Sequence, residues 1–290
     1  MIDLHIHSIY SDGTYSIDEI LLEAQKNNVT TISITDHNTI DAYYDVINKK
    51  NTVYKGEVIT GVEIDCIAYN YKIELLGYNF KKFDMLKNWL NKYYSSEKRK
   101  LFRAKEYTKL LDKMCEVNIL NGCNLIYDES DLPHTAVYKN IIKYPSNKSY
   151  MTELEWNDFD TFFRNATTNS DSLFFIDYLD MLPSIDEVSD IIRRAGGKIF
   201  IAHVYHYKMD HHIQFIMKLV NDHFIDGVEV FHSKFTVDQT KQLIDFCKCK
   251  KIFMSGGSDS HGLKGNIKNN IGTGYGNLYV PESILTEWHK

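Results

Sequence analysis

The first seven residues alternate between apolar and polar side chains. The apolar set is Ile2, Leu4 and Ile6, and the polar set is Asp3, His5 and His7. This two-residue period predicts a β-strand with one apolar and one polar face. His5 and His7 then project from the same face, about 7 Å apart along the strand. Such a pair can begin a divalent metal site, although surface strands also carry His-x-His.

Helical and strand periods alternate from this strand to residue 83. Ser16-Ile17-Asp18-Glu19 has the form of a capping box, and it opens a helix with an apolar stripe. Strands are predicted at 29–35, 58–64 and 71–80, and a helix at about 39–48. This β-α-β-α-β order favours a parallel sheet or barrel.

The alternation stops at residue 84 and resumes after residue 175. The stretch between is polar, aromatic and rich in turn signals, and it is predicted to be an inserted helical subdomain. A second capping box at Ser184 then leads into strands at 198–204, 227–231 and 252–255 and helices at 210–222 and 237–248. The predicted division is one barrel built from 1–83 and 176–290, with 84–175 inserted.

Composition limits the classes of partner. The 290 residues are 43% hydrophobic and carry a formal net charge of −6, so one large α/β domain is expected and a stable complex with long nucleic acid is not. No apolar run is long enough for a membrane span.

The five cysteines are scattered and odd in number, which is typical of reduced thiols in a cytoplasmic protein. The sequence leaves the oligomeric state open.

Four polar residues share a position relative to the predicted strands. His37, Glu63, His203 and Asp259 fall late in a strand or just after one. In parallel α/β folds that edge hosts ligands, because the strand-to-helix loops converge there. Each residue alone has a plain structural explanation, such as a helix cap, a core histidine or a turn. Their joint placement beside His5 and His7 predicts a divalent metal site.

The motifs in this order resemble the PHP (polymerase and histidinol phosphatase) superfamily. They are His5-x-His7, Ser11-Asp12, Thr35-Asp36-His37, Gly61-Val62-Glu63, Ala202-His203 and Gly257-Ser258-Asp259-Ser260-His261-Gly262. The similarity is greatest to the branch with a helical insertion, which includes nucleoside 3′,5′-bisphosphate phosphatases and short-RNA 5′ exonucleases. It implies a distorted (β/α)7 barrel that holds two or three divalent ions, namely manganese, iron or zinc, with magnesium as a further candidate.

The resemblance also implies a ligand set. It places His5, His7, Glu63 and Asp259 on a first metal, Asp12, His37 and His261 on a second, and Glu63, Glu74 and His203 on a third. Relatives usually carry histidine at the position of Glu74. A carboxylate there favours harder ions such as manganese, iron(II) or magnesium over zinc.

A charge count points to a phosphate ligand. Asp12, Glu63, Glu74 and Asp259 would supply four negative charges and three divalent ions six positive ones, so the surplus suits a phosphate monoester dianion or a bridging hydroxide. Metal-bound hydroxide is then the expected nucleophile. The chain shows no Gly-x-Ser-x-Gly elbow, glycine-rich phosphate loop or catalytic cysteine motif.

The insertion departs from the pattern of the relatives. Leu132-Pro133-His134 stands where the bisphosphatase branch has Arg-Pro-His, so a bidentate phosphate clamp is missing at that position. His134, His206 and His232 are candidate substrate contacts, and a plain core or surface role is the alternative for each. Because the insertion follows the strand that bears Glu74, it is expected to leave from the same end of the barrel and to cover the site.

These observations predict that the protein is a metal-dependent phosphoesterase acting on a small phosphorylated metabolite or nucleotide. One alternative is a 5′ exonuclease of short RNA or DNA, and another is a histidinol-phosphatase-like enzyme. An alternative of a different class is a catalytically weak metal-binding regulatory module, which the Glu74 substitution and the missing arginine would favour.

Overall fold

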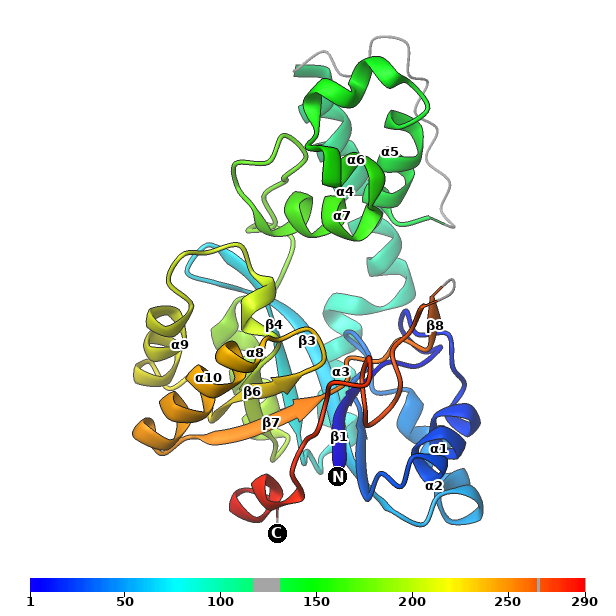
Figure 1. Ribbon diagram of the computed structural model, residues 1–290, viewed down its shortest axis with the longest axis vertical. Helices are drawn as coiled ribbons and strands as arrows, with labels where there is room; N and C mark the ends of the chain where they lie inside the picture. Colours follow the sequence, from blue (N-terminus) through cyan, green and yellow to red (C-terminus); the bar gives the residue numbers. More distant parts are fainter. Residues whose placement is uncertain (117–130, 265–266, 290) are drawn as a thin grey trace.

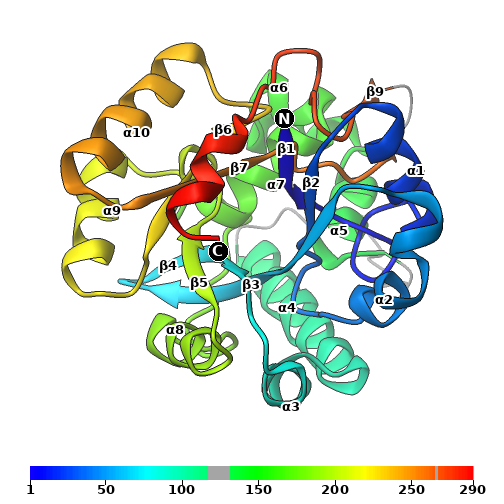
Figure 2. The ribbon, with the colours of Figure 1, turned by 90° about the horizontal axis from the view of Figure 1, so that it is seen from below.

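A seven-stranded sheet curls into a nearly closed barrel (Figures 1 and 2). The computed structural model describes residues 1–116, 131–264 and 267–289. The strands, adjacent in chain order, are β1 (Ile2–Ile6), β2 (Thr31–Ile34), β3 (Glu57–Ala68), β4 (Tyr71–Tyr78), β5 (Lys198–Ile201), β6 (Gly227–His232) and β7 (Phe253–Gly257). A backbone hydrogen bond from Asp259 N to His5 O, 2.9 Å long, joins the two edges. The predicted distorted seven-stranded α/β barrel with a helical insertion is confirmed.

The sheet departs from the favoured parallel arrangement at β4. This strand runs antiparallel to both β3 and β5, whereas the other neighbours are parallel. The sequence pattern suggested that the third strand ends at residue 64, but β3 continues to Ala68. Tyr69 and Asn70 then turn the chain with φ values of 49° and 70°. A two-residue turn with positive φ at both positions makes an antiparallel hairpin.

Helices surround the barrel wall and a short element closes its lower end. The surrounding helices are α1 (Ile17–Lys26), α2 (Ala42–Val53), α3 (Phe83–Tyr94), α8 (Ile185–Arg194), α9 (His212–Asn221) and α10 (Val237–Lys250). Shorter elements are the 3-10 helices η2 (Val204–His206) and η3 (Glu282–Glu287) and a small hairpin of β8 (Leu263–Lys264) and β9 (Ile267–Lys268). After η3, Trp288 packs on Tyr78 and Phe200. That contact seals the end of the barrel opposite the predicted ligands.

The insertion has a hydrophobic core of its own. It contains α4 (Ser96–Glu116), α5 (Pro133–Ile141), η1 (Pro145–Tyr150), α6 (Glu153–Asn157) and α7 (Phe159–Thr168). Leu110, Val137 and Phe162 are fully buried at its centre. In Figure 1 this helical group stands above the barrel, on the side where the parallel strands end.

The route into the insertion differs from the expected one. Because β4 is antiparallel, it ends at Tyr78, which pairs with Lys198, the first residue of β5. The chain therefore leaves β4 at the far end of the barrel. Helix α3 carries it back while Leu86 and Leu90 pack into the barrel core. Helix α4 then begins beside the ligand-bearing end, where Arg99 Nη2 donates to Asn38 O at 3.3 Å.

Two further expectations concern membranes and thiols. None of the described helices is both long and apolar enough to cross a lipid bilayer. Cys66, Cys115, Cys247 and Cys249 are free thiols, and Cys123 lies outside the described residues.

Candidate metal centre

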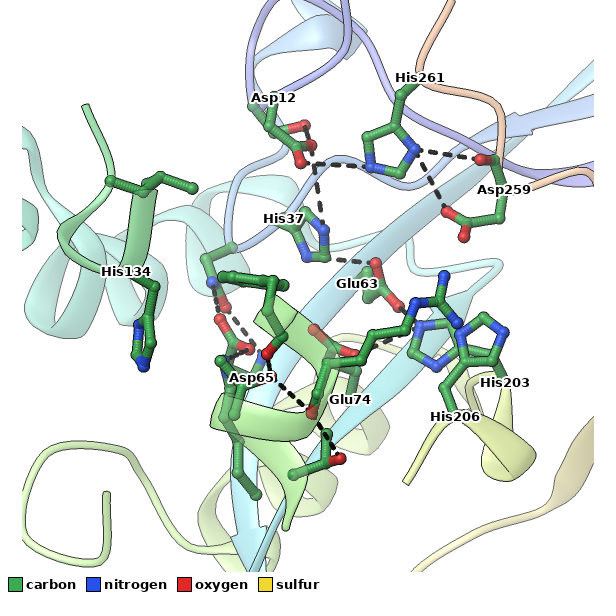
Figure 3. A pocket seen from close by; sticks show the side chains of 18 of the residues that line it. Asp12, His37, Glu63, Asp65, Glu74, His134, His203, His206, Asp259 and His261 are labelled. Carbon is green, nitrogen blue, oxygen red and sulfur yellow. Dashed lines mark hydrogen bonds and ion pairs between the residues drawn. The ribbon is translucent and has the colours of Figure 1, made fainter. Parts of the chain in front are cut away.

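Nine side chains converge inside one end of the barrel, and Figure 3 labels seven of them: Asp12, His37, Glu63, Glu74, His203, Asp259 and His261. Donor atoms within 4.8 Å of one another form four groups: His7, Asp12, His37 and His261; His5, Glu63 and His203; His5, His7 and Asp259; and His37, Glu63 and Glu74. The structure thus brings together every residue that the sequence pattern and the family resemblance proposed as a ligand. The grouping differs from the expected sets, because His7 also joins the Asp12 group, His203 groups with His5, and His37 groups with Glu63 and Glu74.

Glu63 lies at the centre of the cluster and is fully buried. Its Oε2 is 3.3 Å from His5 Nε2, 3.3 Å from His7 Nε2 and 3.2 Å from His37 Nδ1. Its Oε1 is 3.0 Å from His203 Nε2. One carboxylate therefore faces four imidazoles, as expected of a ligand shared between neighbouring sites.

The outer ligands lie on two sides of Glu63. On one side, Asp12 Oδ2 is 3.2 Å from His261 Nε2, and Asp259 Oδ1 is 3.3 Å from His7 Nε2. On the other side, Glu74 Oε2 is 3.3 Å from His203 Nε2. Asp12 is the most exposed of the candidate ligands, with 45% of its side chain accessible. The cluster therefore opens toward solvent at Asp12 and is closed beneath His5 and Glu63.

Local folding explains why a loop residue such as Asp12 reaches the cluster. The buried carboxylate of Asp36 accepts hydrogen bonds from Ser8 N at 2.7 Å, Ser8 Oγ at 2.6 Å and Ser11 Oγ at 2.6 Å. These bonds fold residues 8–11 tightly after β1. The sequence contained the Asp36-His37 pair, but its pattern did not show that Asp36 organises the loop that carries Asp12.

The carboxylates create a strong preference for positive charge. Burial by itself lowers the pKa of His203, but contact with Glu63 and Glu74 raises it to about 9. The pKa of His37 is likewise lowered by burial and raised, to about 9, chiefly by Glu63 and Asp12. Burial and the neighbouring Glu63 carboxylate raise the pKa of Glu74. A cation among these groups would satisfy the carboxylates without protonating the imidazoles.

The donor set fits divalent metal ions. His7 Nδ1, Glu63 Oε2 and His203 Nδ1 are buried atoms with no hydrogen-bond partner in the described structure. Burial, followed by the nearby imidazoles of His261 and His37, lowers the pKa of His7 to about 3, so this ring stays neutral. Neutral imidazole and carboxylate are the forms in which these side chains bind metal. Unpaired buried polar atoms are costly, and coordination would satisfy Glu63 Oε2.

Two of the candidate ligands have backbone angles that are rare outside glycine. The φ values are 21° at His203 and 55° at Asp259. Hydrogen bonds hold both residues: His203 N donates to a Glu229 oxygen at 2.6 Å, and Asn269 Nδ2 donates to Asp259 O at 3.0 Å. Strain of this kind persists only where surrounding contacts enforce it, and it concentrates at functional sites.

A cavity of about 540 Å³ extends from the ligands to the insertion. Its floor includes Glu63, Asp259 and His261, and its upper wall includes Leu132 and Arg164. Cationic side chains also line it, namely Lys72, Arg99, Arg103, Arg164 and Lys234, although the basic stretch from Lys98 to Lys109 is typical of a solvated helix face. They come from four separate segments, because Arg99 and Arg103 share α4, so only the fold shows that they line one cavity.

The three predicted substrate contacts occupy different places. His206 lines the cavity beside His203, with the two rings stacked and their centroids 4.8 Å apart. His134 lines the opposite side of the cavity (Figure 3), where its Nδ1 is 3.3 Å from Glu106 Oε1 and its buried Nε2 has no described partner. His232 is not among the lining residues. It is buried, and its Nε2 lies 3.4 Å from Asp259 Oδ2, so its contact in the structure is with a candidate ligand.

Comparison with known proteins agrees with this arrangement. The PHP domain model matches residues 3–261. A 5′-3′ exoribonuclease of Haemophilus influenzae is 29% identical over 99% of this chain and 98% of its own length. A phosphoribosyl 1,2-cyclic phosphate 1,2-diphosphodiesterase of Eggerthella lenta is 22% identical over 91% and 95%.

The fold is also found in a solved structure. A Bifidobacterium adolescentis protein, provisionally described as a metal-dependent phosphoesterase, superposes with a TM-score of 0.67 at 16% identity, covering 98% of this chain and 94% of that one. At this identity the likeness concerns the fold. Because the matching model extends over most of the sequence and includes all nine converging side chains, the chain belongs to the PHP domain family.

Proposed function

We propose that this chain is a metal-dependent phosphoesterase that hydrolyses a phosphate ester of a nucleotide-sized substrate. The observation that carries the proposal is the convergence of nine imidazole and carboxylate side chains, seven of which line a cavity that arginines also line. Related proteins named as an exoribonuclease and a cyclic phosphate diesterase both act on phosphoesters, which supports the same reaction class.

The roles of the residues follow from their positions. Two or three divalent ions, when bound, would supply Lewis acidity, would acidify water at the site and would offset charge on the phosphoryl group. Glu63 would hold neighbouring ions together, and the outer ligands would complete each site. His134 and His206 face the cavity, where they would contact the substrate. The insertion covers the cavity and would exclude bulk water during the reaction.

The upper wall favours a nucleotide over a smaller metabolite. Arg103 and Arg164 line it together with the aromatic rings of Phe102, Phe163 and Tyr275. Arginine suits phosphate, and aromatic rings stack on nucleobases. This combination makes a 5′ exonuclease of short RNA the second candidate. The chain's net charge of −6 argues for short strands rather than long ones.

A turnover assay tests the proposal. The purified protein is incubated with an aryl phosphate, with and without added Mn²⁺, and then with a nucleoside 3′,5′-bisphosphate and a short 5′-phosphorylated RNA. We expect metal-dependent release of phosphate or nucleotide, and faster turnover of the nucleotide substrates than of the aryl phosphate. Metal binding without turnover of any substrate would instead identify a metal-binding regulatory module.

Replacing Glu74 by histidine should shift the metal preference toward zinc. Glu74 Oε2 lies beside His203 and Glu63, and substitution exchanges a hard oxygen donor for an imidazole. After equal exposure to Mn²⁺ and Zn²⁺, elemental analysis of Glu74→His should give a higher ratio of zinc to manganese than the parent protein. Tyr71→His is the control, because Tyr71 is exposed at the start of the same strand. An unchanged ratio would show that Glu74 does not set metal preference.

A further inference from the structure

A second glutamate lies beneath the candidate metal centre and belongs to none of the four donor groups. Glu229 is the third residue of β6, between the buried residues Val228 and Val230. Side chains alternate along a strand, so Glu229 projects to the opposite face from the two valines and into the barrel interior. It is 0% exposed. A carboxylate buried this deeply is costly unless its oxygens are fully engaged.

Each oxygen of Glu229 contacts a different candidate ligand. Oε1 lies 2.8 Å from His5 Nδ1, and Oε2 accepts a hydrogen bond from the backbone N of His203 at 2.6 Å. Among the described residues, no lysine or arginine pairs with Glu229. Both hydrogen-bond contacts are therefore with candidate ligands, His5 and His203.

The contact with His5 decides which ring nitrogen can bind a metal. Because the carboxylate accepts a hydrogen bond from Nδ1, the proton of a neutral His5 ring stays on Nδ1. The lone pair of Nε2 then points into the cluster, 3.3 Å from Glu63 Oε2 and 3.7 Å from Asp259 Oδ1. A carboxylate behind a metal-binding histidine fixes the tautomer in this way and raises the basicity of the ring.

The contact with His203 holds a strained backbone. His203 has a φ of 21°, a conformation that few residues adopt unless their surroundings impose it. The hydrogen bond from its backbone N to Glu229 follows directly after β5, at the residue where the chain turns into η2. Glu229 therefore links the ring orientation of one ligand to the backbone position of another.

We propose that Glu229 is a positioning residue for the metal centre, one that orients His5 and His203 together and so sets metal affinity. The proposal rests on the proposed metal-dependent function. It concerns metal binding directly, so it can be tested even if the substrate is a different phosphoester or if turnover is absent.

Glutamine is the informative replacement because it keeps the shape and cannot make both contacts. Its single carbonyl oxygen can accept from His203 N, but its NH₂ group then faces His5 Nδ1. The ring must accept that hydrogen bond and move its proton to Nε2, which blocks the lone pair that would bind metal. Alternatively the amide rotates, and the bond to His203 N is lost.

The test compares Mn²⁺ binding by the parent protein and Glu229→Gln in calorimetric titrations of metal-stripped samples. Loss of a carboxylate behind a metal ligand typically lowers affinity roughly 10- to 100-fold, and we expect a Kd increase in that range. The control is Glu155→Gln in the insertion. Glu155 is also buried and accepts from a backbone N, that of Thr152 at 2.7 Å, but it lies outside the cluster. It should lose stability without losing metal affinity.

A second measurement covers the case in which Glu229→Gln does not fold. In the zinc-loaded parent protein labelled with ¹⁵N-histidine, the ring of His5, assigned by comparison with a His5→Asn sample, should carry its proton on Nδ1. Equal Mn²⁺ affinity in the parent and Glu229→Gln, or a His5 ring protonated at Nε2, would overturn the proposal. A parent protein that binds metal but hydrolyses nothing would contradict the proposed function and leave the role of Glu229 supported.

Discussion

Glu63→Gln is expected to lower kcat for aryl phosphate hydrolysis in Mn²⁺ by roughly 10³-fold. Loss of a single electrostatic contact in an active site typically costs about 10²–10³ in kcat, and Glu63 faces four imidazoles at 3.0–3.3 Å. A neutral amide would also face those imidazoles partly with a donor group, which opposes metal binding. Elemental analysis should therefore show lower metal content in the same sample.

The control for this prediction lies on the same strand. Glu57 begins β3, its side chain is 52% exposed, and it pairs with His289 at 3.0 Å. Glu57→Gln should leave kcat and metal content unchanged. If Glu63→Gln retained its metal and more than a tenth of its kcat, Glu63 would not be a central ligand, and the assignment of the cluster would be wrong.

The sequence was sufficient to predict which side chains converge, because their positions follow the geometry of strands. His5 and His7 share one face of β1 through the two-residue period, and His37, His203 and Asp259 follow directly after parallel strands. Strand order alone brings such positions to one end of a barrel. The same reasoning placed Glu63 correctly although its strand continues beyond it, because His37 and Glu63 form a parallel bridge at the point where β2 ends.

Other features depend on tertiary contacts that leave no local pattern. The antiparallel direction of β4 follows from the turn at Tyr69 and Asn70, where neither residue is glycine and the apolar pattern suggested two separate strands. Glu229 lies in a strand of ordinary composition. Only the fold shows that its carboxylate on β6 contacts the ring of His5 on β1. The cavity arginines are a third case, since a basic residue in an amphipathic helix is usually a solvated one.

Arg164 is an example of a cation that the fold leaves free to bind an anion. It lies on α7 and lines the cavity, and within the described part of the chain it has no ion-pair partner. Lys105 and Lys109 on α4 differ, because both pair with Asp180. Both Arg164 and His206 line the cavity, and burial, the neighbouring His203 and His232 rings and Arg164 lower the pKa of His206.

A substrate with a second phosphate would meet Arg164 while its first phosphate lies on the metal centre. Arg164→Met keeps most of the side-chain stem and removes the charge. A hydrogen bond to a charged group is worth about 1.5–3 kcal/mol, so KM for a nucleoside 3′,5′-bisphosphate should rise roughly 10- to 150-fold. KM for a simple aryl phosphate should stay nearly constant, because that substrate has nothing to place against the upper wall.

Leu132→Arg is the reciprocal variant. Leu132 is 43% exposed, lines the same cavity and precedes the first residue of α5, at the position where the family resemblance implies an arginine. An added guanidinium should lower KM for the bisphosphate and leave KM for the aryl phosphate unaffected. Arg194→Met, on the outer surface of α8, is the neutral control.

If Arg164→Met changes KM for both substrates equally, Arg164 supports the fold of the insertion and does not select the substrate. If Leu132→Arg also leaves the bisphosphate KM unchanged, the second phosphate does not reach this wall. The cavity would then select a substrate with one phosphate and a neutral remainder.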